Sequence, residues 1–330
     1  MPHCNNMSLR RTKCKVPVKF PRQFWNTDAN PSQNAQEEPG FARVRGPPAG
    51  EFRLECKGEN PLRDAVPANP TFNDLLATAH ALADRAGAVI LPHFRTGLAI
   101  SHKGGALFDP VTAADLVAET AIREALAATH PAHGIIGEEL GATRSDADYC
   151  WIIDPIDGTR AFIVGQPLWG TLIGLVQEGR PLLGLMNQPF IGERFWSGED
   201  QSYFRHRGSP EQTIRTRPCG SLSEALLTAS SPDLFESDEE QTRFAAIAGA
   251  VRLRRFCGDC YNYCLLALGQ IDLVVEAGLK DFDILPLIPI IERAGGVVST
   301  WEGGDPRKGG RILAAGDPRL HEQAVKLLSS

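Results

Sequence analysis

The sequence predicts a fold of the α/β class, an α+β layered sandwich in which helices cover β-sheets, and two observations lead to it. Segments with helical periodicity alternate with short strand-like runs over most of the chain. Residues 169–205 break this alternation, because turn dipeptides separate successive strand-like runs there, as antiparallel hairpins require. We therefore expect helices with an antiparallel sheet first, and a mixed sheet after a seam near residue 210.

The first two expected elements are helices with recognisable starts. Thr71 and Asp74 form a capping pair, and Leu75 begins an apolar stripe at helical spacing. Thr112 is the expected N-cap of the second helix, with Asp115 three residues further on. These signals are local, so they predict where each helix begins.

Short apolar runs predict the strands. Residues 134–139, Gly-Ile-Ile-Gly-Glu-Glu, are typical of a strand that ends in acids, and Trp-Ile-Ile at 151–153 indicates an interior strand. In the second half of the chain we expect three strands and two helices. The strands are 225–231, 272–277 and 295–300, and the helices are 259–269 and 283–296.

The composition argues against several classes of protein. The chain has 330 residues, 42% of them hydrophobic and 22% charged, as in water-soluble globular proteins. No apolar run approaches the roughly 20 residues that cross a bilayer, so we expect no membrane partner. A net charge of −6 argues against a nucleic-acid partner. Eight scattered cysteines without a secretory signal indicate a reducing compartment, and we expect the cytoplasm.

Residues 1–68 differ from the rest and are predicted to be a disordered N-terminal extension. The segment starts rich in basic residues and poor in acids, and it lacks periodicity. A plastid transit peptide and an upstream start-site artefact both explain such a segment. The remaining chain is expected to form an N-terminal α+β subdomain at 69–210 and a C-terminal α/β subdomain at 211–330.

Four pairs of acids stand where predicted elements begin or end. Carboxylates at such ends point into the crevices where ligands bind in layered α/β folds. Gathered together they would repel each other, and a hard divalent cation such as Mg²⁺ would relieve that repulsion. A plain helix-capping role stays open for Asp115. The pairs are Asp109 and Asp115, Glu138 and Glu139, Asp154 and Asp157, and Asp281 and Asp283.

Residues 154–159, Asp-Pro-Ile-Asp-Gly-Thr, combine two of these acids with a predicted helix start. Gly158 lets the backbone come close to a ligand. The N–H groups of Gly158, Thr159 and Arg160 would face outward at the start of this helix, where anions bind. Cations held by acids beside an anion-binding turn predict a phosphate ester as the substrate.

Residues 109–115, 137–139 and 154–159, with Asp283 in a late helix, resemble the inositol monophosphatase superfamily over roughly residues 70–328. The resemblance implies an inositol monophosphatase/fructose-1,6-bisphosphatase-like αβαβα architecture, Mg²⁺ as cofactor and a homodimer. The Mg²⁺ ligands that it implies are Glu138, Asp154, the carbonyl of Ile156, Asp157 and Asp283. The implied phosphate-binding residues are Gly158 and Thr159. The residues implied to orient and help deprotonate the attacking water are Thr159 and Asp115, and Glu138 is implied to be catalytic as well as a metal ligand. Two outlying positions that match, near a third and weaker metal, are Lys103 and Asp109.

Residues 258–298 are similar to the histidinol-phosphate phosphatase branch of this superfamily, and Phe282 stands where inositol-type members tend to have Trp. Histidinol carries an ammonium group and an imidazole, so its pocket needs anions. Asp259 and Glu276 are expected to supply them, together with Asp283, although a plain N-cap role stays open for Asp259. Residues 281–286, Asp-Phe-Asp-Ile-Leu-Pro, depart from the branch, because they are more apolar than its usual helix start and place Pro286 in the first turn, where proline is tolerated.

The prediction is a Mg²⁺-dependent phosphomonoesterase that hydrolyses L-histidinol phosphate, a small-molecule phosphate ester, in histidine biosynthesis. Within the superfamily, inositol-1-monophosphatase and nucleotide 3′-phosphatase are the alternatives. A non-catalytic regulator that binds a metal or a sugar phosphate is an alternative of another class. A zinc or redox role for Cys257 and Cys260 is disfavoured against helix packing, because no second Cys/His pair follows at the required spacing.

Overall fold

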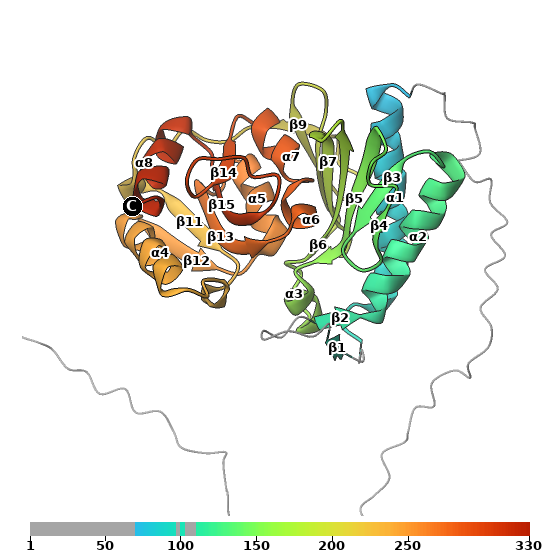
Figure 1. Ribbon diagram of the computed structural model, residues 1–330, viewed down its shortest axis with the longest axis horizontal. Coiled ribbons are helices and arrows are strands. Elements are labelled where there is room, and N and C mark those ends of the chain that lie inside the picture. Colours follow the sequence, from blue (N-terminus) through green and yellow to red (C-terminus); the bar gives the residue numbers. More distant parts are fainter. Residues whose placement is uncertain (1–69, 97–99, 103–109) are drawn as a thin grey trace, which may run out of the picture. The chain divides into compact units, whose positions relative to one another are not determined.

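Two large β-sheets with helices packed on them dominate the part of the chain that the computed structural model describes, residues 70–96, 100–102 and 110–330 (Figure 1). The predicted layered α/β fold is therefore confirmed. The N-terminal extension expected at residues 1–68, and the outlying positions Lys103 and Asp109, lie outside the described residues.

Two long helices, α1 (Phe72–Ile90) and α2 (Ala113–Thr129), pack against each other and against the first sheet. Both begin at the predicted caps, Thr71 and Thr112, and each cap exchanges hydrogen bonds with the acid at the third helical position. The short strands β1 (Ile100–His102) and β2 (Pro110–Thr112) pair as a hairpin ahead of α2. The predicted stripe of α1 is buried, and Ile90 continues it; the stripe consists of Leu75, Ala79, Leu82 and Ala86.

The first large sheet has eight strands in the order β10-β9-β8-β7-β6-β5-β3-β4. Its strands β6 to β9 form the antiparallel meander predicted at 169–205, and β5 and β10 extend it on either side. Strands β3 and β5 run parallel, however, so the sheet is mixed rather than antiparallel. The reason is β4, which forms a hairpin on one side of β3 and returns the chain to the other side. The strands are β3 (Gly134–Gly137), β4 (Gly141–Thr143), β5 (Tyr149–Asp157), β6 (Gly170–Gln177), β7 (Arg180–Gln188), β8 (Glu193–Ser197), β9 (Ser202–His206) and β10 (Gln212–Ile214).

The second large sheet has five strands in the order β12-β11-β13-β15-β14. Strand β11 runs parallel to β12 and β13, while β15 is antiparallel to β13 and β14, so the predicted mixed sheet is confirmed. The strands are β11 (Leu226–Ala229), β12 (Leu253–Phe256), β13 (Leu273–Leu279), β14 (Val297–Thr300) and β15 (Gly310–Ala315).

Helices cover this sheet and link it to the first one. Helices α4 and α8 contact each other, and α8 also packs on β15. Helix α7 contacts β7, β8 and β9 of the first sheet as well as β14 of the second. The helices of the second half are α4 (Asp238–Ala250), α5 (Asp259–Ala267), α6 (Asp281–Ile284), α7 (Ile288–Arg293) and α8 (Pro318–Leu328). A further short α-helix is α3 (Thr159–Ile163). Three short 3₁₀ helices are η1 (Leu91–His93), η2 (Leu222–Glu224) and η3 (Pro232–Leu234).

One predicted helix is divided in the structure. The sequence favoured a single helix over residues 283–296, but α6 ends at Ile284 and α7 begins at Ile288. Pro286 between them has no N–H for a helical hydrogen bond. Its carbonyl oxygen instead lies against β7, where a side chain on Gly184 would place its Cβ only 1.7 Å from that oxygen. The break therefore brings the backbone at Pro286 into direct contact with β7 of the first sheet.

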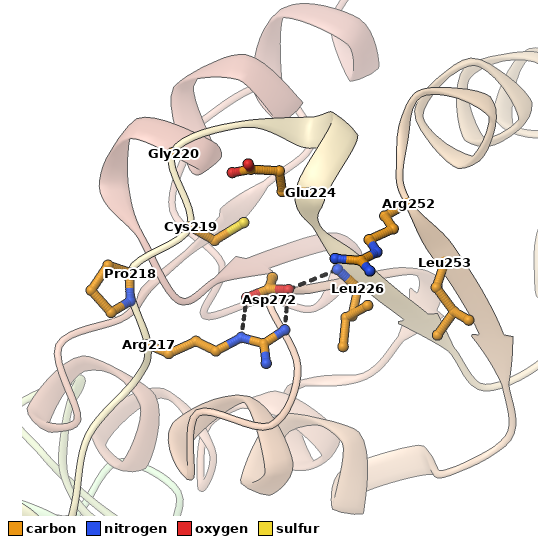
Figure 2. Close-up of a pocket in the computed structure, with 9 residues that line it drawn as sticks. All are labelled: Arg217, Pro218, Cys219, Gly220, Glu224, Leu226, Arg252, Leu253 and Asp272. Atoms are coloured by element: carbon orange, nitrogen blue, oxygen red, sulfur yellow. Dashed lines mark hydrogen bonds and ion pairs between the residues drawn. The ribbon is translucent and has the colours of Figure 1, made fainter.

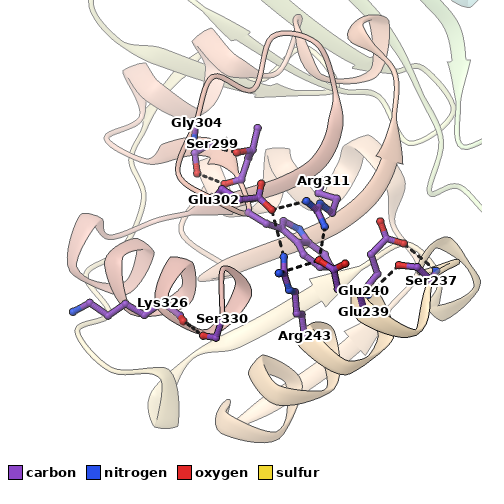
Figure 3. A network of polar contacts seen from close by, with 12 residues as sticks. Ser237, Glu239, Glu240, Arg243, Ser299, Glu302, Gly304, Arg311, Lys326 and Ser330 are labelled. Carbon is purple, nitrogen blue, oxygen red and sulfur yellow. Dashed lines mark hydrogen bonds and ion pairs between the residues drawn. The ribbon is translucent and has the colours of Figure 1, made fainter.

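A network of ion pairs holds α4 to the β14–β15 hairpin (Figure 3). Arg243 and Arg311 each contact both Glu239 and Glu302, with nitrogen–oxygen distances from 2.6 to 3.5 Å. These side chains are partly exposed, so each single pair stabilises the fold by less than about 1 kcal/mol. Because four alternating charges share one network, its main effect is to fix how α4 sits on the hairpin.

The core places the acids at the ends of buried strands. Trp151, Ile152 and Ile153 of β5 are buried, as expected for an interior strand, and Asp154 and Asp157 follow them. In layered α/β folds, ligands bind in the crevices at such strand ends. Among the described residues, no helix has the length and apolar character that crossing a bilayer requires.

Candidate active site

Three acids from two distant segments of the chain meet at the end of β5. One carboxylate oxygen from each of Asp154, Asp157 and Asp283 lies within 4.8 Å of the others. Asp154 and Asp157 come from β5, whereas Asp283 comes from α6. The side chain of Glu138, which follows β3, is within hydrogen-bonding reach of Asp154. The structure thus brings together the four carboxylates that the sequence singled out as metal ligands.

The electrostatics of this cluster fit a cation site. Burial, followed by repulsion from Glu138, Asp157 and Asp283, raises the pKa of Asp154 well above its usual range. Burial and neighbouring acids also raise the pKa of Asp157 strongly, and burial raises that of Asp283 to about 7. Buried carboxylates that repel one another favour protonation unless a cation compensates their charge. Oxygen donors at this density match a hard divalent cation such as Mg²⁺.

Asp115 adds a buried oxygen that lacks a protein partner. Its Oδ2 accepts hydrogen bonds from the N–H of Thr112 (2.9 Å) and from the Thr112 hydroxyl (2.6 Å). Its Oδ1 is buried without a hydrogen-bond partner in the described part of the chain. Burial raises the pKa of Asp115, and repulsion from Glu138 adds to this effect. An orphaned buried acceptor beside an acidic cluster fits a bound ion or water. Asp115 therefore caps α2 through Oδ2, while its Oδ1 is available to a bound ion or water.

The turn after β5 is organised by its own polar groups. The N–H of Ile156 donates to Asp154 Oδ1 at 3.0 Å, and the Thr159 hydroxyl donates to the Ile156 carbonyl oxygen at 3.1 Å. Gly158 has a φ of +83°, which favours glycine. A Cβ there would lie 3.1 Å from an Asp259 carboxylate oxygen. Gly158 therefore permits both the turn and the approach of Asp259.

The second half of the chain holds two of the acids through its backbone. The N–H of Cys260, in the first turn of α5, donates to Asp157 Oδ2 at 2.6 Å. The N–H of Lys280 donates to Asp283 Oδ2 at 2.7 Å. These backbone donors orient the two carboxylates and leave their other oxygens for a ligand.

A hollow of about 590 Å³ opens beside the cluster, and a recess of about 150 Å³ adjoins it. This volume is in the range of small-molecule sites. Both spaces contact Asp259, Ser230 and Asp283, so they form one substrate-sized region next to the acids. Residues lining the larger hollow include Glu138, Gly158, Thr159, Arg160, Asp259 and Lys280.

The two acids predicted to bind substrate occupy different surroundings. Burial raises the pKa of Asp259 to about 6, against a hydrogen bond from Ser230 and the charge of Arg160. Glu276 is 3% exposed, and burial raises its pKa to about 7. Glu276 Oε1 accepts from the N–H (2.8 Å) and the hydroxyl of Ser230, and Oε2 accepts from the Tyr263 hydroxyl (2.9 Å). Asp259 thus faces the larger hollow, whereas Glu276 is held by protein donors in the wall of the recess.

Ser230 is a site residue that the sequence interpretation missed. It follows β11 and joins Glu276 to Asp259 by hydrogen bonds. Its only sequence signal is its position after a buried strand, which many serines share. The predicted packing role of the nearby cysteines holds for Cys260 and Cys264, which are buried in the core, while Cys257 is exposed.

Another hollow of about 590 Å³ lies elsewhere, next to the starts of β11 and β12 (Figure 2). Its charged centre is a bidentate pair in which Arg217 donates to Asp272 at 2.7 and 2.6 Å. The N–H of Leu226 donates to the same carboxylate at 2.7 Å. Asp272 is therefore satisfied by protein donors, and the converging acids of the first hollow make it the better candidate site.

A layered α/β fold with buried acids gathered at strand ends beside a substrate-sized hollow fits a metal-dependent phosphatase. The chain belongs to the inositol monophosphatase family, whose model matches residues 73–330. This match covers nearly all described residues and includes every acid of the cluster. The family resemblance expected from the sequence is confirmed.

Relatives and solved structures support the same conclusion. The chain is 41% identical over 263 residues to the bifunctional phosphatase IMPL2, chloroplastic, of Arabidopsis thaliana, covering 76% of this chain and 74% of that protein. It is 36% identical over 230 residues to a histidinol-phosphatase of Chlorobaculum parvum, covering 69% and 86%. A solved inositol monophosphatase from Zymomonas mobilis is 43% identical with a TM-score of 0.70, covering 79% of this chain and all of that one.

Proposed function

We propose that the protein is a Mg²⁺-dependent phosphomonoesterase that hydrolyses L-histidinol phosphate to L-histidinol and phosphate, a step of histidine biosynthesis. The observation that carries the choice of substrate is the carboxylate of Asp259, which lines the hollow directly beside Gly158. An anion at this position suits a substrate whose phosphate is flanked by a cationic group.

The carboxylates of Asp259 and Glu276, which both line the proposed substrate pocket, repel each other. Burial raises the pKa of both Glu276 and Asp259, and repulsion from Asp259 adds to the shift of Glu276. A cationic substrate would relieve this repulsion, whereas the hydroxyl groups of inositol would not. The ammonium or imidazole of histidinol phosphate would therefore pair with Asp259, and Glu276 would support the pocket through Ser230.

The residues that would hold Mg²⁺ are Glu138, Asp154, the carbonyl of Ile156, Asp157 and Asp283. When bound, Mg²⁺ would neutralise phosphate charge and make a water molecule more acidic. The fit rests on the carboxylate cluster and on the orphaned Oδ1 of Asp115.

The remaining steps belong to the chain itself. Thr159 Oγ1 donates to the Ile156 carbonyl, so its lone pairs face away from that bond and can accept a hydrogen from the attacking water. Asp115, fixed by Thr112, would receive the proton at Oδ1. As the water oxygen bonds to phosphorus, the bond from phosphorus to the histidinol oxygen would break, and that oxygen would take a proton from a water molecule in the open hollow. The backbone at Gly158 and Thr159 would bind the phosphate, because the turn after β5 leaves it open to the hollow.

The names of relatives support this choice, and a substrate panel tests it. Histidinol-phosphatases of Mycobacterium tuberculosis and Streptomyces coelicolor are 31% and 33% identical to this chain.

We expect phosphate release from histidinol phosphate to exceed that from inositol-1-phosphate and a nucleoside 3′-phosphate by at least about tenfold in kcat/KM. Chelation should abolish release. Preference for either other ester would reject the proposed substrate, and no release from any ester would favour a non-catalytic regulator.

Inositol-1-monophosphatase is the second candidate, because the solved Zymomonas mobilis protein, 43% identical to this chain, is named an inositol monophosphatase. Two further expectations are also proposals. We expect a homodimer, which light scattering would test. The cytoplasm is the expected compartment, and a plastid is the alternative, which the name of the Arabidopsis relative supports. Microscopy of the tagged full chain would decide between them.

A further inference from the structure

We propose that Glu119, together with Arg123, is a positioning pair that holds the turn bearing Glu138 and so sets the metal site before any cation binds. The inference rests on the proposed function for the role of Glu138. Glu119 lies on α2, is 0% exposed and does not belong to the acidic cluster described above. A buried charge of this kind requires specific partners.

Both carboxylate oxygens of Glu119 are used to hold the turn between β3 and β4. Oε2 accepts a hydrogen bond from the N–H of Glu139 at 2.8 Å, and Oε1 accepts one from the N–H of Leu140 at 3.2 Å. These are the two residues that directly follow Glu138. Hydrogen bonds from N–H groups to a carboxylate are among the stronger ones in proteins. Glu119 therefore fixes the backbone immediately after the proposed metal ligand.

Arg123, on the same helix, also holds this hairpin, and we call Glu119 and Arg123 together the clamp. Its Nε donates to Glu119 Oε1 at 2.8 Å, and its Nη1 donates to the Thr143 hydroxyl at 3.1 Å. Its Nη2 donates to the carbonyl oxygen of Gly141. Arg123 thus balances the buried charge of Glu119 and also holds β4, the second strand of the hairpin.

Gly137 shows how tightly the clamp is fitted. A Cβ at Gly137 would lie 2.0 Å from Glu119 Oε1 and 2.4 Å from its carboxyl carbon. The carboxylate therefore rests directly on the backbone at the end of β3. Only glycine leaves room for it, so the residue before Glu138 is adapted to Glu119.

The clamp links two parts of the proposed catalytic machinery. Asp115 lies one turn before Glu119 on the same buried face of α2. Burial raises the pKa of Asp115, and repulsion from Glu138 raises it further. The N–H of Glu138 also donates to the Ile153 carbonyl oxygen of β5 at 3.1 Å. Glu138 is thereby held from β5 on one side and, through the following residues, from α2 on the other. Such support of a ligand by a second layer of residues tunes metal affinity.

The test is calorimetric titration of the full chain with MgCl₂ in the absence of substrate. Glu119→Gln keeps the size of the side chain but loses its charge and one acceptor. We expect its Mg²⁺ affinity to fall about 10- to 100-fold, with a lower kcat and a nearly unchanged KM. Glu124→Gln is the matched control on the same helix, because Glu124 is exposed and pairs with Arg85, a surface residue, at 3.2 Å. We expect wild-type affinity from it.

Separate outcomes distinguish this inference from the proposed function. Reduced Mg²⁺ affinity in Glu119→Gln supports the inference even if the enzyme prefers another ester. Unchanged affinity with a lowered melting temperature overturns it, since Glu119 would then be merely structural. A wild-type chain that binds no Mg²⁺ overturns it as well. If Glu119→Gln fails to fold, Arg123→Gln takes its place, because Arg123 is partly exposed and its loss should weaken Mg²⁺ binding in the same direction.

Discussion

Asp157, at the end of β5, accepts a hydrogen bond of 2.6 Å from the backbone N–H of Cys260 at the start of α5. This bond joins an acid of the first sheet to a helix of the second half of the chain. It orients Asp157 toward Asp154 and Asp283, and it brings Asp259, the neighbour of Cys260, next to Gly158. The positions of Asp157, a proposed metal ligand, and of Asp259, a proposed substrate residue, therefore both depend on this contact.

Replacing Asp157 by Asn should nearly abolish turnover, by about 10³-fold or more, because the amide is a poor ligand for a divalent cation. The fold should remain intact, since the amide oxygen can still accept from Cys260. In the presence of chelator the free energy of unfolding should even rise, by about 1 kcal/mol, because one repelling charge is removed. Steady-state kinetics and urea denaturation measure the two effects. Exposed Asp146→Asn is the control, and near-normal turnover in Asp157→Asn would refute its role as a ligand.

Without divalent cations, the protein should lose stability as the pH rises from about 4 to 7. Asp283 and Glu276 have pKa values raised from 3.8 and 4.5 to about 7, so the folded state binds more protons than the unfolded state in this window. Stability from these groups is present at low pH and is lost as they ionise. Each ionising group contributes at most about 1.4 kcal/mol per pH unit.

Mg²⁺ should flatten this pH dependence, because a cation favours the ionised carboxylates. Urea denaturation across pH 4.5–8, with chelator and with Mg²⁺, measures it. Mg²⁺ binding near pH 6.5 should also release protons, which calorimetry in buffers of different ionisation enthalpy detects. A metal-free protein that gains stability toward pH 8 would contradict the clustering of ionisable acids.

Asp259→Ala should raise KM for histidinol phosphate by about tenfold or more and change turnover of inositol-1-phosphate little, because only the first substrate offers a cation. Asp233→Ala is the control, since Asp233 lines the same hollow but is exposed. Kinetics with both esters measure the effect. An equal loss for both esters would show that Asp259 serves the turn at Gly158 rather than substrate choice.

Gly158→Ala should lower activity and the free energy of unfolding. The φ of +83° costs an L-residue about 1–2 kcal/mol, and the new Cβ would also press on Asp259 at 3.1 Å. Gly179→Ala is the matched control, because its φ is +76° but a Cβ there meets nothing within 4 Å. Both variants should lose similar stability from backbone strain. Only Gly158→Ala should lose turnover, as measured by steady-state kinetics, and equal activity in the two would argue against a close approach at Gly158.

Local signals were sufficient for much of the fold. The caps at Thr71 and Thr112 and the interior strand at 151–153 were predictable because each has a local sequence signal, a capping pair or a continuous apolar run. The parallel pairing of β3 with β5 was not, since pairing direction depends on where β4 returns the chain. The break at Pro286 was underestimated, because the backbone there is seated by contact with Gly184 of another strand.

The same distinction applies to the site. By itself the sequence determined which side chains could do chemistry: the acids of 154–159, the glycine that permits the turn, and the acids at 138 and 283, all recognisable by type and position. Only the tertiary structure decided that Asp283 reaches β5, that Ser230 and Tyr263 hold Glu276, and that Glu119 supports the turn after Glu138. The physical reason is that hydrogen bonds and charge repulsion act over a few ångströms in space, whereas these partners lie far apart along the chain.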